Sequence, residues 1–144
     1  TTAAKARAEQ SGRHCSAIEL DDGTIITAET GDLLGPSAAL ILNALKHLAD
    51  IDHSIKLIPQ HMIEPIQHTK TNYLRSRNPR LHTDEVLVAL SVLSPHDDNC
   101  RRALGMLPRL KGCQAHSTVM LGEVDRKIFN KLGVGLTCDP RKKS

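Results

Sequence analysis

The sequence predicts an α/β domain: a layered mixed sheet with an N-terminal β-hairpin and flanking helices. Short segments with alternating apolar residues, typical of strands, alternate with longer segments that carry apolar residues at helical spacing. Glycine and proline residues separate many of these segments. The expected order is roughly ββαβαααβαβ, and 144 residues are enough for one domain with its own core.

The first predicted element is a hairpin in the stretch SAIELDDGTIITAE, residues 16–29. Apolar and polar residues alternate between Ile18 and Ile25, and Asp22 and Gly23 form a typical two-residue turn. This hairpin makes the sheet mixed, because the later strands follow helices that allow parallel pairing.

Helices are predicted over residues 36–49, 64–74, 84–93, 95–110 and 123–133, and further strands over residues 54–58, 115–121 and 134–138. Pro36 and Pro65 each suit a first helical turn, where the missing N–H has no helical partner. Thr83 is expected to cap the helix that follows it, Pro108 to end the helix at 95–110, and Gly133 to end the last helix.

The predicted domain covers residues 16–140, with a linker or the end of an upstream helix at 1–15 and a disordered tail at 141–144. One Tyr, one Phe and no Trp mean that aliphatic side chains must fill the core. Because aromatic residues are scarce and the net charge is only +3, the sequence predicts that nucleic acid is not a partner.

Four cysteines without a CxxC pair indicate thiols in a reducing compartment, so a cytoplasmic location is expected. The sequence predicts no membrane association, because it has no apolar stretch long enough to span a bilayer. Cys113 and His116 have a C-x-x-H spacing, but one such pair does not predict a metal site.

The first candidate site is the stretch TGDLLGPSAAL, in which a glycine loop leads into a helix N-terminus. Backbone N–H groups near Gly35 and the hydroxyl of Ser37 are candidate donors to an anion. The lysine and spacing of a Walker motif are missing. Alternatively, the glycines only form a tight turn and Pro36 only starts the helix.

The second candidate site is the stretch LRSRNPRLHTDEV, residues 74–86. Arg75, Arg77 and Arg80 are candidate ligands of phosphate or carboxylate, since the guanidinium fork binds such groups in a bidentate manner. Asn78 before a proline forces a turn and is included in the predicted ligand site. Alternatively, the arginines pair with carboxylates elsewhere in the chain or in a neighbouring subunit.

Two histidines are the candidate catalytic acid/base groups: His82 in this stretch, and His116 in the stretch GCQAHSTVM. Ser117, next to His116, is a further candidate ligand-binding residue. A Ser-His-acid triad of Ser117, His82 and Asp84 is conceivable, but nothing in the sequence supports its geometry. Alternatively, and preferably for His116, this histidine is a loop residue that only forms hydrogen bonds.

Long stretches such as SRNPRLHTDEV and GCQAHSTV, together with DGTIITAETGDLLGPSAALILNALKHLADI, resemble the sequences of a bacterial family of uncharacterised proteins. The resemblance is to the C-terminal domain of the family called domain of unknown function eighteen forty-six, and it covers about residues 16–140. It implies a longer protein whose upstream part has a Gly-Ser-Gly-Lys phosphate-binding loop. Some family members carry the label ATP-dependent peptidase, but this sequence has no protease signature. The family provides no catalytic residues to transfer.

The leading hypothesis is therefore a domain that helps bind a phosphate or nucleotide ligand at a site shared with its own N-terminal domain. The cofactor is unknown, with a nucleotide as the candidate, and a homo-oligomer is expected. The alternative is a docking or oligomerisation module whose arginine loop is structural and has no catalytic role.

Overall fold

The computed structural model describes residues 15–118 and 121–139. The predicted linker, apart from Cys15, and the predicted tail lie outside the described residues. In chain order the elements are β1 (Cys15–Glu19), β2 (Ile25–Glu29), α2 (Pro36–Leu48), α3 (Gln60–His68), the π-helix η1 (Thr69–Tyr73), α4 (Thr83–Leu93), α5 (Asp98–Leu104), the 3-10 helix η2 (Leu107–Leu110), β3 (Gln114–Ser117), α6 (Glu123–Leu132) and β4 (Gly135–Cys138).

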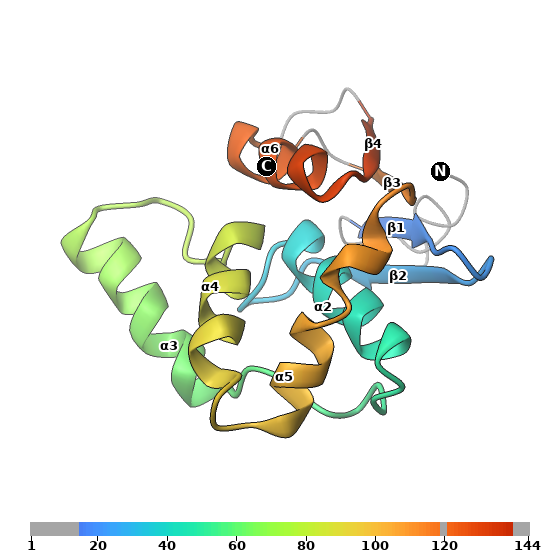
Figure 1. Cartoon of the computed structure of the whole chain (residues 1–144). Coiled ribbons are helices and arrows are strands. Elements are labelled where there is room, and N and C mark those ends of the chain that lie inside the picture. Colours follow the sequence, from blue (N-terminus) through green and yellow to red (C-terminus); the bar gives the residue numbers. More distant parts are fainter. Residues whose placement is uncertain (1–14, 119–120, 140–144) are drawn as a thin grey trace.

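The strands form a four-stranded mixed sheet in the order β2-β1-β3-β4 (Figure 1). β1 pairs antiparallel with β2 and with β3, whereas β3 and β4 are parallel and are joined through α6. In the hairpin turn, Gly23 adopts a φ of 85°, and the Thr24 amide donates to Asp22 Oδ1 at 2.9 Å. The predicted mixed sheet with an N-terminal hairpin is confirmed.

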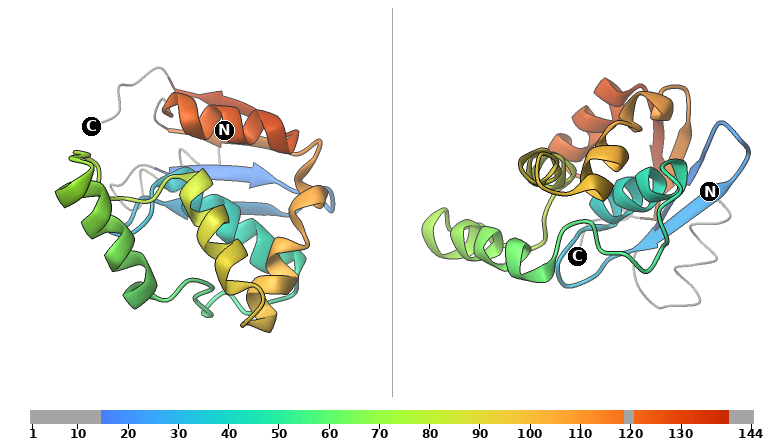
Figure 2. Two further views of the ribbon diagram at one scale, coloured as in Figure 1. Left: turned by 60° about the vertical axis from the view of Figure 1, so that its left-hand side comes forward. Right: turned by 60° about the horizontal axis from the view of Figure 1, so that its bottom comes forward.

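Helix α2 packs on β1 and β2, and α4 and α5 pack against α2, so helices lie in layers beside the sheet (Figures 1 and 2). The core is aliphatic, as predicted. Its largest fully buried side chains include Leu40, Ile41, Leu45, Leu81, Leu90 and the single Phe129. Helix α6 contacts α4, β4 and η2.

Helix α3 and the following η1 lie at the side of the domain, where Ile63 of α3 joins the core, and both views in Figure 2 show α3 projecting sideways. The turn of η1 is wider than an α-helical turn, because the Leu74 amide donates to the Thr69 carbonyl five residues back, at 3.0 Å. We call α3 and η1 together the projecting arm. Its outer end leads directly into the arginine-rich loop.

The predicted strand at 54–58 is wrong. The carbonyls of His53 and Ile55 accept hydrogen bonds from the Lys46 ammonium, each at 3.0 Å, and the segment pairs with no described strand. Burial lowers the pKa of Lys46, whose side chain is almost completely covered. Leu57 and Ile58 still reach the core, which explains the apolar pattern.

Three predicted helix ends also differ from the structure. Pro65 lies inside α3, which begins at Gln60. The predicted helix at 95–110 is divided into α5 and η2. Asp97 caps α5 through a 3.1 Å bond from the Cys100 amide, α5 ends at Leu104, and Pro108 lies in the first turn of η2 instead of ending a helix. His82, rather than Thr83, is the N-cap of α4.

Gly133 ends α6 as predicted and adopts a φ of 81°, so it provides a test of this helix end. We expect Gly133→Ala to lower the free energy of unfolding by about 2 kcal/mol, because an L-residue is strained in this conformation. Its Cβ would also lie 2.8 Å from Lys111 Cγ. Urea unfolding measures the change. Gly105→Ala is the matched control, since its Cβ would meet only ordinary contacts of 3.5 Å; equal losses in both variants would contradict the prediction.

Candidate functional site

The two candidate anion-binding segments lie side by side. Leu34 and Leu81 form a parallel β-bridge. The Gly35 amide donates to the Leu81 carbonyl at 3.2 Å, and the Leu81 amide donates to the Leu33 carbonyl at 3.0 Å. We call residues 31–35 and 75–82 the paired loops. Their contact joins segments that are more than forty residues apart in the chain.

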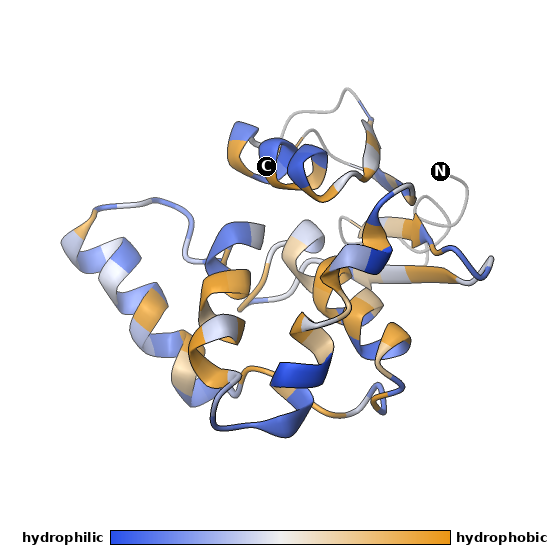
Figure 3. Cartoon of the chain, viewed as in Figure 1, coloured by the Kyte–Doolittle hydropathy of each residue, from blue (hydrophilic) through white to orange (hydrophobic). Residues whose placement is uncertain are grey.

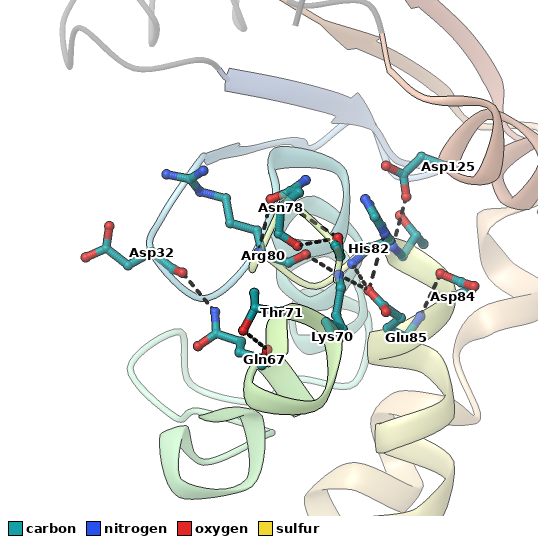
Figure 4. Close-up of polar contacts among 12 residues, drawn as sticks. Asp32, Gln67, Lys70, Thr71, Asn78, Arg80, His82, Asp84, Glu85 and Asp125 are labelled. Carbon is teal, nitrogen blue, oxygen red and sulfur yellow. Dashed lines mark hydrogen bonds and ion pairs between the residues drawn. The ribbon is translucent and has the colours of Figure 1, made fainter. Parts of the chain in front are cut away.

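Arg80 strengthens the contact between the paired loops (Figure 4). Its Nε donates to the Gly31 carbonyl at 2.5 Å, and its backbone amide donates to Asn78 Oδ1 at 3.1 Å. Asn78 therefore shapes the loop through its own side chain, whereas the sequence predicted a turn from the restriction that Pro79 places on Asn78. At the far side, Gln67 of α3 donates to the Asp32 carbonyl at 3.0 Å.

A buried lysine joins the arginine loop to α4. Lys70 of η1 is only 6% exposed, and its ammonium donates to the Arg80 carbonyl at 2.7 Å and to Glu85 Oε1 at 2.8 Å. The same Glu85 oxygen accepts from the His82 amide at 2.7 Å and lies 3.3 Å from His82 Nδ1. This junction was not predicted from the sequence, although the three-residue spacing of His82 and Glu85 is that of a capping box.

Arg75 and Arg77 differ from Arg80 in their surroundings. Both are exposed, and neither forms a hydrogen bond or ion pair with any residue that the structure describes. Arg75 has a φ of 58°, a left-handed conformation that turns the chain sharply after η1. The two guanidinium groups are thus not held as buried ion pairs with residues 15–118 or 121–139.

A set of buried polar groups lies behind the paired loops. Thr83, fully buried, donates its hydroxyl to Ser37 Oγ at 3.2 Å and its amide to Asp125 Oδ1 at 2.9 Å. These bonds bring together the N-terminal ends of α2, α4 and α6, as Figure 1 shows. Asp125, Asp84 and Glu85 already place carboxylates at the start of α4, so this helix end is not open to another anion.

The start of α2 is different. The helix has no side-chain cap and no acidic residue in its first turn. Ser37 is 1% exposed, so its hydroxyl lies beneath the surface rather than on it. The Gly35 amide is already bonded to the Leu81 carbonyl. Gly35 and Ser37 therefore support the paired loops directly, and a ligand would reach Ser37 only after local opening.

His116 and Ser117 lie on β3, and both are buried. His116 Nδ1 is 2.6 Å from Thr137 Oγ1, and its Nε2 is 3.1 Å from Asp139 Oδ1. Ser117 is the pairing partner of Ser16, whose hydroxyl donates to the Pro36 carbonyl at 2.8 Å. No described contact joins His116 to His82, so the structure does not bring the two histidines together.

Two further chemical possibilities are weak on geometric grounds. His82, Asp84 and Glu85 offer ligand atoms within 4.8 Å of one another, but the Lys70 ammonium already supplies a positive charge to Glu85. Burial raises the pKa of the Cys113 thiol, which disfavours the nucleophilic thiolate.

The fold and site together define an α/β domain with a mixed sheet and a basic surface loop held by a lysine–glutamate junction. The family model for "Domain of unknown function DUF1846, C-terminal" matches residues 1–144, and this chain belongs to that family. The family predicted from the sequence is thereby confirmed.

The chain is similar to curated proteins named UPF0371 protein. It is 56% identical to that of Corynebacterium aurimucosum over 95% of this chain and 28% of the relative. It is 58% identical to that of Corynebacterium efficiens over 92% of this chain and 27% of the relative. For Streptococcus uberis the identity is 46%, over 97% and 28%. The chain thus spans little more than a quarter of the relatives it matches. Among the described residues, no helix has the length and apolar character needed to cross a bilayer.

Lys70→Met tests whether the lysine junction holds the arginine loop. We expect a loss of about 3 kcal/mol in the free energy of unfolding, because the change leaves the Glu85 carboxylate without its cation. Amide exchange of Leu81 should accelerate as well. Lys127→Met is the control, since Lys127 is exposed and its ion pair with Glu123 should contribute less than about 1 kcal/mol. If Lys70→Met and Lys127→Met lower the free energy of unfolding by equally small amounts, the junction does not hold the loop.

Proposed function

We propose that this domain binds a phosphate group, free or as part of a nucleotide, on the paired loops. One observation carries the proposal: the loop contact places Arg80 against Gly31 and leaves the neighbouring Arg77 exposed, with no carboxylate partner among the residues that the structure describes. In longer family members the ligand would be shared with the rest of the polypeptide, within a cytoplasmic enzyme whose reaction is not specified.

Electrostatics supports a phosphate ligand at this position. The stretch from Ile66 to His82 contains no acidic residue, and the nearest cation toward α4, Lys70, is neutralised by Glu85. Arg75 adds a further exposed positive charge next to Arg77. A phosphate could therefore bind without breaking an existing ion pair, and a guanidinium fork suits its oxygens.

The remaining predicted residues fall into two roles. His82 is half-buried where the paired loops meet α4, and there it would act as the group that exchanges a proton with a bound ligand. His116 and Ser117 would act indirectly, because they are buried on β3, where Ser117 pairs with Ser16, whose hydroxyl donates to the Pro36 carbonyl at the start of α2.

Isothermal titration of the chain with inorganic phosphate and with ATP tests the proposal. We expect Arg77→Ala to weaken binding by roughly 10- to 100-fold, the usual effect of removing a hydrogen bond to a charged group. In wild type, amide NMR shifts should change first at Leu33 and Leu81 of the paired loops.

Arg101→Ala provides the matched control, since Arg101 is a similarly exposed arginine on α5 whose described partner is Asp98. Equal affinity in wild type and Arg77→Ala, or shift changes centred away from the paired loops, would contradict the proposal. So would an equal loss of binding in Arg101→Ala, because it would indicate attraction to net charge alone.

A further inference from the structure

Large apolar side chains are exposed on one side of the domain. Val88 and Val92 lie one helical turn apart on the same face of α4, and each is 64% exposed. Met62 of α3, across from them, is 39% exposed. Figure 3 shows apolar positions on both helices. Contiguous exposed apolar surface of this kind typically marks an interaction site.

Helices α3 and α4 enclose a groove of about 450 Å³ at this surface. Its lining includes Met62, Ile66, Val88, Ala89 and Val92. Asp84 and Glu85 line it as well, so one end of an otherwise apolar groove is acidic. We call it the α3/α4 groove.

The outer end of the projecting arm protrudes, whereas the α3/α4 groove is concave. Tyr73 and Leu74 are 71% and 72% exposed, more than the other large apolar residues that the structure describes. The ring of Tyr73 stands edge-on to that of His68, with centroids 5.3 Å apart. We call these two residues the Tyr73–Leu74 knob. Tyrosine in such a position is a typical anchor of protein interfaces.

The knob and the groove are complementary in charge as well as in character. Arg75 follows the knob directly and has no described acidic partner. At the groove, Asp84 carries the less compensated charge, because Glu85 is paired with Lys70. An apolar knob with a cation beside it thus matches an apolar groove with an anion at its end.

We propose that two copies of this chain associate through a reciprocal contact, in which the Tyr73–Leu74 knob of each enters the α3/α4 groove of the other. One chain carries both halves of the contact, which a twofold axis requires of a self-complementary interface. The projecting arm holds the knob away from the body, where a second copy can receive it (Figure 2). The apolar side chains of this contact are distinct from the phosphate site, which centres on Arg77 and Arg80.

Sedimentation equilibrium of the chain tests the association. We expect wild type to dimerise, and Leu74→Asp and Val88→Asp each to weaken the dimer roughly 100-fold, because each puts a charge into both apolar contacts. Both positions are exposed, and circular dichroism with urea unfolding confirms that the variants fold. Val124→Asp is the control, since Val124 is 47% exposed on α6, outside both surfaces, and this variant should still dimerise.

Mixing the two variants separates a knob-in-groove contact from general stickiness. In a mixed dimer, the intact knob of Val88→Asp meets the intact groove of Leu74→Asp, so one of the two contacts is restored. We expect the mixture to form heterodimers more tightly than either variant alone. A monomeric wild type, a dimer unaffected by both changes, dissociation of Val124→Asp, or no gain on mixing would each overturn the proposal. Arg77→Ala should remain dimeric, which keeps this outcome distinct from that of the phosphate titration.

Discussion

The arrangement of the candidate site depends on the Lys70 ammonium. The wide turn of η1 directs this side chain inward, where it bonds the Arg80 carbonyl and the Glu85 carboxylate. Three segments thus share one buried cation: the projecting arm, the arginine loop and the start of α4. Since Arg80 in turn bonds Gly31, the lysine also fixes where the glycine loop lies. A buried charge satisfied on two sides is costly to displace, so these segments keep one geometry.

At this surface the carboxylates have bonding partners, whereas two of the guanidinium groups have none among the described residues. Asp125 and Asp84 bond amides at the start of α4, and Glu85 bonds Lys70, so the acidic groups near the helix are engaged. Arg75 and Arg77 have no such partners among the described residues. The positive charge of the loop therefore faces outward, and it is available to a ligand or to another protein surface.

Sequence reasoning succeeded where the signal is local. The hairpin turn at Gly23 and the glycine stop at Gly133 follow from conformations that few residues other than glycine adopt. It failed where a distant group decides the structure, as at 54–58, where the Lys46 ammonium rather than a neighbouring strand binds the carbonyls. The meeting of the two candidate anion segments rests on the pairing of Leu34 with Leu81, which no spacing in the sequence encodes.

The short distance along the chain between Leu74 and Arg77 has a thermodynamic consequence. Only two residues lie between Leu74 and Arg77: Arg75, which is left-handed, and Ser76, whose amide anchors the segment by donating to the Lys70 carbonyl at 2.8 Å. Whatever orders this segment on one side also lowers the entropy that remains to be lost on the other. Occupancy of the two surfaces would then be linked reciprocally: each ligand would change the affinity for the other by the same factor.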